Sequence, residues 1–283
     1  MNKKIIWIIV IVLIIIAIFS KIFTNDTNTE EFKPLEKNIG DEFTEISYPN
    51  KMFIINYEIA DITGDGDKDM VFLIGENSEG TDMTNNVITN MDVVLYDVAN
   101  GTFIKAGARK LNGKNNKIIT SDFTGNGTQD VMIISEEDGR KSIRIYTYED
   151  SKLKEIWKER NNKGLVFDGE FIDGFKVQLV NKKLNIDKAI NVSSNEEEYK
   201  NNSFYNASGK LLSENKSVTT TPFCTLEVVL LNDRSGVKTT QRIYGMNEND
   251  IIDEITVVWK YQDGKWQIVE AKGVKLGNLL YWL

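Results

Sequence analysis

The stretch Asp61-Ile-Thr-Gly-Asp-Gly-Asp-Lys-Asp69 sets oxygen-bearing residues at the first, third, fifth and ninth positions of a tight turn. A second copy, Asp122-Phe-Thr-Gly-Asn-Gly-Thr-Gln-Asp130, follows 61 residues later with the same spacing. Calcium takes about six to eight oxygen ligands, and alternate side chains around a turn can converge on one ion. Two copies in register therefore predict a repeated calcium-binding loop.

The predicted ligands fall at equivalent positions of the two loops. In the first loop they are Asp61, Thr63, Asp65, the backbone carbonyl of Asp67, and Asp69. In the second loop they are Asp122, Thr124, Asn126, the backbone carbonyl of Thr128, and Asp130. Neither loop has the bidentate Glu of an EF-hand, so we expect weak binding, with Kd of about 10⁻⁴–10⁻³ M. The alternative is an ordinary Asp/Gly turn that holds no metal.

The residues that follow each loop decide between calcium-binding folds. An EF-hand or a dockerin continues into a helix. Here the short apolar runs Met70-Val-Phe-Leu-Ile74 and Val131-Met-Ile-Ile134 come next, and their β-branched character is typical of buried strands. The pattern therefore favours a strand, calcium loop, strand arrangement.

Three hairpin patterns indicate how many such units the chain holds. Each has an aromatic residue before a tight turn and an apolar residue after it: Tyr96…Asn100-Gly101…Phe103, Tyr146…Asp150-Ser151…Leu153, and Trp259…Asp263-Gly264…Trp266. Residues 51–111 and 115–159 thus each predict four antiparallel strands, and residues 164–212 and 223–273 predict two weaker units. We expect an all-β fold, a β-propeller-like array of about four four-stranded units.

The pattern Asp-x-Thr-Gly-Asp/Asn-Gly-x-x-Asp between two strands resembles the FG-GAP/VCBS repeats of integrin-like calcium-binding β-propellers. The resemblance covers residues 50–160 well and residues 164–273 weakly. It implies a calcium-stabilised surface interaction or adhesion module, with a protein or glycan as its ligand.

The N-terminus carries an apolar segment. Residues 5–19 are apolar, follow Lys3 and Lys4, and extend to residue 23 if the stem of Lys21 is included. At about 1.5 Å per residue, residues 5–23 approach the hydrocarbon thickness of a bilayer. We expect a transmembrane signal anchor there, with a cytoplasmic tip (residues 1–4), a flexible linker (24–44) and an extracytoplasmic domain (45–283) in a single-pass cell-membrane protein. A cleaved signal peptide is the alternative.

The amino-acid composition excludes several classes of function. The chain has no histidine, which excludes Ser-His-Asp and Cys-His catalysis, and a net charge of −8 that disfavours nucleic acid as a partner. We therefore expect a binding protein with no catalytic residues. A calcium-dependent polysaccharide-acting enzyme, which needs only two carboxylates, and a structural cell-envelope component are the alternatives. Four tryptophans near predicted strand ends, Trp157, Trp259, Trp266 and Trp282, are expected to pack between units, with a carbohydrate platform as the other reading.

Overall fold

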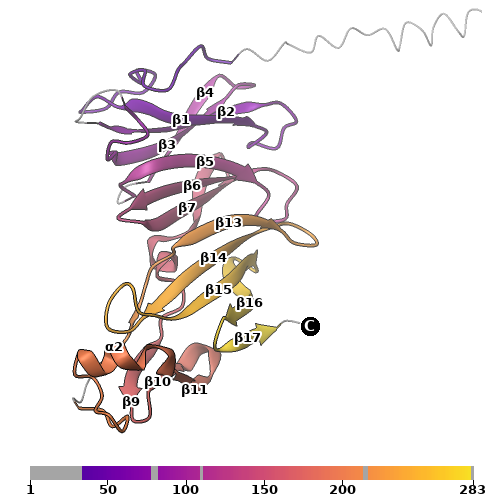
Figure 1. Cartoon of the computed structure of the whole chain (residues 1–283). Helices are drawn as coiled ribbons and strands as arrows, with labels where there is room; N and C mark the ends of the chain where they lie inside the picture. Colours follow the sequence, from indigo (N-terminus) through magenta and orange to yellow (C-terminus); the bar gives the residue numbers. More distant parts are fainter. Residues whose placement is uncertain (1–33, 78–81, 109–110, 213–215, 282–283) are drawn as a thin grey trace, which may run out of the picture. The chain divides into compact units, whose positions relative to one another are not determined.

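The computed structural model describes residues 34–77, 82–108, 111–212 and 216–281. All the elements named below belong to one compact unit, Leu35–Leu283. Within it the chain forms four antiparallel sheets, so the prediction of an all-β fold is confirmed (Figure 1).

The first two sheets are the repeated units that the sequence predicts. Each has four strands in chain order, joined by the Asp/Gly loop and then by hairpins. The first sheet consists of β1 (Phe53–Ala60), β2 (Asp69–Glu76), β3 (Thr89–Asp97) and β4 (Thr102–Gly107). The second consists of β5 (Lys114–Ser121), β6 (Asp130–Glu137), β7 (Arg140–Glu149) and β8 (Lys152–Trp157).

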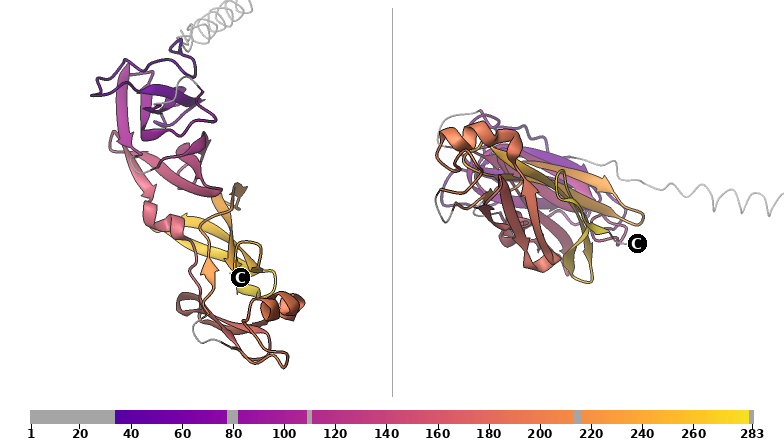
Figure 2. Two further views of the ribbon diagram at one scale, coloured as in Figure 1. Left: turned by 60° about the vertical axis from the view of Figure 1, so that its left-hand side comes forward. Right: turned by 60° about the horizontal axis from the view of Figure 1, so that its bottom comes forward.

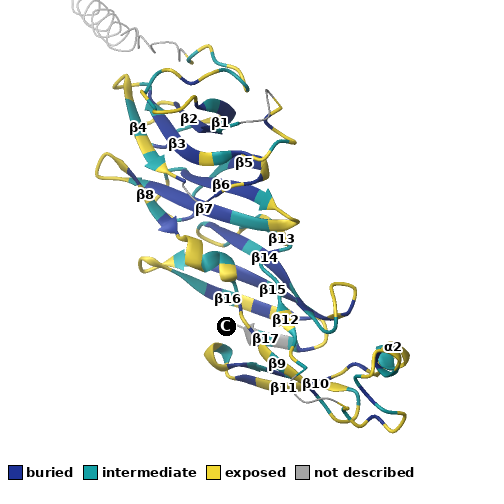
Figure 3. Ribbon diagram, turned by 90° about the vertical axis from the view of Figure 1, so that its left-hand side faces the viewer, coloured by how far each residue is buried: buried dark blue, intermediate teal, exposed yellow. Residues whose placement is uncertain are grey.

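These two sheets pack face to face, which explains their continuous apolar strands. One cluster of buried side chains joins Val71 and Leu73 of β2 to Val131 and Ile133 of β6. A strand covered on both faces needs apolar residues at successive positions, and β2 is buried from Asp69 to Gly75. Figure 3 shows the central strands of both sheets in dark blue.

All three predicted hairpin turns are present. They join β3 to β4, β7 to β8, and β15 (Ile251–Gln262) to β16 (Lys265–Gly273). Both central residues have positive φ in two of these turns, Asp150 at 52° and Ser151 at 57°, and Asp263 at 52° and Gly264 at 74°, whereas in the β3–β4 turn Gly101 has positive φ, at 61°. Positive φ matches the twist of a tight hairpin, which is why Asp, Ser and Gly occupy these positions.

The rest of the chain departs from the prediction of two more four-stranded units. The third sheet has three strands, β9 (Asp168–Ile172), β10 (Lys176–Asn181) and β11 (Ile186–Asn191). Short helices flank them: η1 (Glu159–Lys163), η2 (Lys182–Leu184), η3 (Ser193–Asn195) and α2 (Glu196–Asn201). The fourth sheet has six strands, β15 and β16 with β12 (Thr219–Thr220), β13 (Thr225–Leu230), β14 (Ser235–Tyr244) and β17 (Gly277–Tyr281).

The order of the sheets in space differs from their order in the chain. The six-stranded sheet contacts the second sheet through Trp157 and Trp259, whose rings lie 5.7 Å apart. It contacts the third sheet where Lys188 Nζ donates to the Leu276 carbonyl at 3.1 Å. Figures 1 and 2 show it between the two. Among the described strands, no pairing closes the sheets into a ring, so a closed propeller is not shown.

The predicted membrane span, residues 5–23, lies outside the described residues. In the part of the chain that the structure describes, no helix is long and apolar enough to cross a bilayer. The α-helix that is described, α2, has six residues, which rise about 9 Å. The prediction of a single-pass, membrane-anchored protein is therefore corrected.

Trp157 is the centre of the contact between the second and the six-stranded sheets. Its side chain is fully buried and meets the rings of Trp259 and Trp266 edge to face, with centroids 5.7 and 4.8 Å away. Its indole Nε1 donates to Asn162 Oδ1 at 3.0 Å. The expected packing role is thus correct for these three tryptophans, while Trp282 lies outside the described residues.

Replacing Trp157 with alanine should lower the free energy of unfolding by about 3–5 kcal/mol, because a buried ring is lost and a cavity remains. Denaturant unfolding followed by circular dichroism measures this. Leu230→Ala is the control, because Leu230 is 89% exposed and its loss should change the free energy by less than about 0.5 kcal/mol. Equal effects of the two substitutions would contradict the packing assignment.

Candidate functional site

The first predicted calcium loop is a turn held by its own backbone amides. The Asp61 carboxylate accepts the amides of Gly64 and Gly66, at 2.7 and 3.2 Å. At the other end, Asp69 Oδ2 accepts the amide of Thr63 at 2.9 Å and its hydroxyl at 3.1 Å. Both glycines have positive φ, 79° and 95°, which explains their place in the motif.

The second loop repeats this geometry. The Asp122 carboxylate accepts the amides of Gly125 and Gly127, at 2.5 and 2.9 Å. Asp130 Oδ2 accepts the amides of Phe123 and Thr124, both at 2.8 Å. The two loops are therefore one device used twice, as their sequences predict.

The remaining predicted ligands make short local contacts. Asp65 Oδ1 accepts the Asp67 amide at 2.9 Å, and Asn126 Oδ1 accepts the amide and hydroxyl of Thr128, at 2.9 and 2.7 Å. Among the described residues, no three acidic, cysteine or histidine side chains gather as a metal-binding group. The loops thus place the predicted ligands on the same turns without collecting their carboxylates at one point.

Asp69 and Asp130 differ from the other loop carboxylates because they are fully buried. In each, Oδ2 is bound by loop amides. Burial raises the pKa of both carboxyl groups, and hydrogen bonds oppose that rise. For Asp69 these come mainly from Thr63 and Ile62 and also from the Val98 amide, and for Asp130 they come from the Thr147 side chain and the Thr124 and Phe123 amides. A buried carboxylate is costly unless it holds a proton or meets a cation, so these two groups fit the oxygen ligation that calcium prefers.

The loops stack in a series along one edge of the sheets. The Gln129 amide of the second loop donates to the Asp61 carbonyl of the first, at 3.2 Å. In the same way, the Ser235 amide at the start of β14 donates to the Asp122 carbonyl, at 2.7 Å. The turn between β13 and β14 therefore contacts the second loop in the same way as the second loop contacts the first.

Arg234 in that third turn lies against Gly125 of the second loop, as Thr128 of the second loop lies against Gly64 of the first. Its Nη1 donates to the Thr124 carbonyl at 2.6 Å and to the Tyr261 carbonyl at 2.8 Å. Its Nη2 pairs with Asp233 Oδ2 at 2.7 Å, and the two cations Arg234 and Lys260 lower the pKa of Asp233 to about 2. One guanidinium thus joins the second loop to β15.

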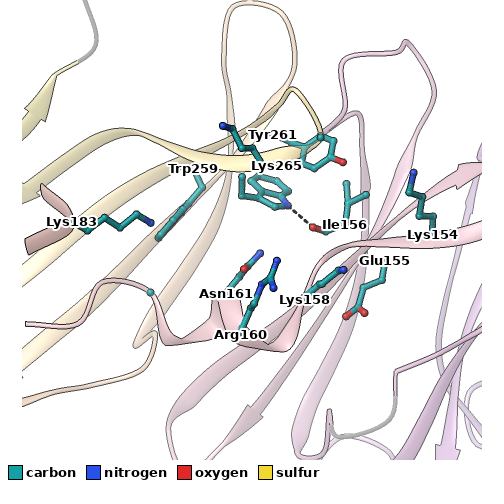
Figure 4. Close-up of a pocket in the computed structure, with 13 residues that line it drawn as sticks. Lys154, Glu155, Ile156, Lys158, Arg160, Asn161, Lys183, Trp259, Tyr261 and Lys265 are labelled. Carbon is teal, nitrogen blue, oxygen red and sulfur yellow. Dashed lines mark hydrogen bonds between the residues drawn. The ribbon is translucent and has the colours of Figure 1, made fainter.

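A cleft that the sequence analysis did not predict lies between the second sheet and the six-stranded sheet (Figure 4). Its volume is about 340 Å³. One wall comes from β8 and η1, and the other from the hairpin of β15 and β16, with Lys183 of η2 at one end. We call this space the basic cleft because of the side chains described next.

The charge of the basic cleft is opposite to that of the whole chain. Five cationic side chains line it: Lys154, Lys158, Arg160, Lys183 and Lys265. Its one carboxylate, Glu155, pairs with Arg144 Nε at 3.0 Å, and Lys154 pairs with Glu149 outside the cleft. In a protein of net charge −8, this is a local positive potential that favours an anion.

Three aromatic side chains, Trp259, Tyr261 and Trp266, form the apolar part of the basic cleft. The indole N–H groups are already used, since Trp266 donates to the Ile156 carbonyl at 3.1 Å and Trp259 to Thr239 Oγ1 at 2.9 Å. These two side chains therefore offer ring surface, and no indole donor, to a ligand. Figure 4 shows Arg160 and Asn161 across the cleft from Trp259.

Part of the basic cleft was visible in the sequence. Residues 152–163 contain five basic side chains, and the tryptophans near strand ends were noted as a possible carbohydrate platform. The sequence did not show that these segments lie side by side, because Arg160 and Trp266 are about a hundred residues apart in the chain. No local periodicity reports such a long-range contact.

Residues 165–274 match the protein family described as YybI C-terminal domain. The match covers β9 to β16 and leaves out both Asp/Gly loops. It corrects the resemblance to FG-GAP/VCBS repeats, which rested on those loops. The physical reason is that a nine-residue Asp/Gly turn closes through its own amides and so carries little information about the surrounding fold. No curated protein matches the chain.

Two solved structures are similar over 85% of this chain. One is the Bacillus licheniformis rhamnogalacturonan lyase PL11, with 15% identity and a TM-score of 0.36. The other is the exotype rhamnogalacturonan lyase YesX, with 14% identity and a TM-score of 0.34. The aligned part spans 37% and 36% of those chains. Likenesses at this level carry no argument about activity.

Replacing both buried loop carboxyl groups, in the variant Asp69→Asn/Asp130→Asn, should flatten the pH dependence of stability in the presence of a chelator. A raised pKa means that the folded state keeps a proton that the unfolded chain has released. The resulting stability is present below the ordinary pKa of 3.8 and is lost as pH rises through the folded pKa.

Denaturant unfolding across that window measures the effect as the difference in slope between the wild type and the variant. Asp65→Asn/Asp138→Asn removes two exposed carboxylates and is the matched control. Parallel pH profiles for the wild type and the Asp69→Asn/Asp130→Asn variant would show that the two buried groups do not titrate in this way.

Proposed function

We propose that the protein is a non-catalytic binding module that takes an anionic glycan in the basic cleft. The observation that carries this proposal is the combination of five cations with three aromatic side chains in one cleft. Aromatic rings pack against the C–H faces of sugars, and Lys and Arg pair with their carboxylates. A binding site of this size typically joins apolar walls to a few charged groups in the same way.

An acidic peptide is a less suitable ligand for this cleft. An extended peptide gains most of its affinity by pairing with a free strand edge. The strand that borders the cleft, β8, is an edge strand, but the Trp266 indole already occupies its Ile156 carbonyl. The cleft instead offers side-chain charge and ring surface, which suit a sugar chain.

The absence of catalysis is part of the proposal. Hydrolysis of a glycosidic bond needs two carboxyl groups about 5–9.5 Å apart, and Glu155 is the one carboxylate that lines the cleft. That group is paired with Arg144. Burial raises the pKa of Tyr261, so its hydroxyl keeps its proton and is a poor base. A polysaccharide-acting enzyme therefore lacks support from this cleft.

We also propose that the two Asp/Gly loops bind calcium weakly and stiffen the frame that holds the cleft. The support is the oxygen-rich turn, present twice, and the full burial of the Asp69 and Asp130 carboxyl groups at its end. The ion would offset the cost of burying these carboxylates. The loops are already closed by amide hydrogen bonds, so the expected effect is added stability and not folding itself.

Calcium should raise the melting temperature of the full chain, with about 2.7 kcal/mol of added stability at a hundredfold excess of free ion over Kd. Thermal unfolding at increasing free calcium measures it. The Asp61→Ala/Asp122→Ala variant should lose the dependence, whereas Glu58→Ala/Glu137→Ala, which removes two exposed carboxylates elsewhere, should keep it. A wild type that is insensitive to millimolar calcium would refute the calcium proposal.

Removing two cations from one wall, in the variant Lys158→Ala/Arg160→Ala, should weaken binding of trigalacturonate about tenfold, because each exposed charge pair contributes modestly. Isothermal titration calorimetry at low salt measures the affinity. Lys210→Ala/Lys272→Ala lowers the net charge equally but leaves the basic cleft intact, so it should bind like the wild type. Equal losses in both variants would point to bulk charge attraction and not to the cleft.

A further inference from the structure

The basic cleft does not end at η1. A second hollow, of about 340 Å³, shares Gly164 and Lys183 with it and continues past Val166 to Asp168 and Val180. A third hollow, of about 460 Å³, shares Asp168 and Val180 with the second. Because neighbouring hollows share these residues, the three lie in series from the cleft to β9 and β10 of the third sheet, and we call this series the path.

The chemistry changes along this path. At the cleft end there are five cations and one paired carboxylate. The middle hollow has Lys182, Lys183 and Asp168, with Val166 59% exposed beside them. At the far end the charged groups are Asp168 and Glu170, both exposed. They stand two residues apart on β9 and so point to the same side of the strand.

The carboxylates at the far end disfavour a polymer with an acid on every unit and favour a polymer with neutral units at this place. A chain with an acidic group on every unit would meet like charges at Asp168 and Glu170. Neutral sugar hydroxyls, in contrast, are good donors to these two carboxylates, which line the hollow together with Gln178. The far end therefore fits neutral sugar units, while the cleft fits acidic ones.

We infer that the path binds a heteropolysaccharide, with acidic units in the basic cleft and neutral units over β9 and β10. This inference rests on the proposed function, since the cleft must first take an anionic glycan. It adds that the ligand is a polymer of mixed charge and that affinity comes from several connected subsites.

Defined-length hyaluronan oligosaccharides, which alternate acidic and neutral units, test the length of the site. Calorimetry should give a decasaccharide about fivefold tighter binding than a tetrasaccharide, because only the longer chain reaches β9 and β10. Oligogalacturonates of the same two lengths carry an acid on every unit and should show no such gain. Equal affinity for the two hyaluronan lengths would overturn the inference.

The variant Asp168→Asn/Glu170→Gln separates the far subsites from the cleft. It should raise the affinity of the long oligogalacturonate and leave trigalacturonate binding unchanged, because only the long chain meets these two groups. Both residues are exposed, so circular dichroism should confirm an unchanged fold. If trigalacturonate binds but this variant leaves the long chain unaffected, the extended path is wrong and the proposed function stands. If trigalacturonate does not bind, both fail.

Discussion

The fold depends on two buried carboxylates that begin central strands. Asp69 and Asp130 are the first residues of β2 and β6, and each binds the amides of the loop that precedes it. This contact fixes where the loop ends and where the strand enters the core. Because β2 and β6 face each other through one apolar cluster, these two contacts set where both central strands enter the same core.

Local chemistry explains which parts of the fold were predictable. The Asp/Gly loops, the apolar runs after them and the hairpin turns at Asn100, Asp150 and Asp263 each require particular residues for backbone reasons, so the first two sheets could be read from the sequence. The third unit could not. Asp168-Gly169 looks like a turn, yet it lies within β9, because pairing with Leu179 and Val180 of β10 overrides the local preference.

The two kinds of candidate site also differ in how far the sequence predicts them. The amide-bound loops with Asp61 and Asp122 are local objects, and their geometry follows from nine residues. The basic cleft joins η1 to a hairpin on a different sheet, and its position depends on Trp157 packing against Trp259 and Trp266. The prediction of about four four-stranded units failed in the second half of the chain, where long-range pairing gives a three-stranded and a six-stranded sheet.

The guanidinium of Arg234 connects the second Asp/Gly loop to the basic cleft. It holds the Thr124 carbonyl of the second loop and the Tyr261 carbonyl beside the basic cleft, and the ring of Phe123 from the same loop lies 6.1 Å from that of Trp266. The first loop contacts the second through the Asp61 carbonyl and the Gln129 amide, and so it is linked to the basic cleft through the second loop. A change in the second loop is therefore transmitted to the basic cleft directly, whereas a change in the first loop reaches it through the second.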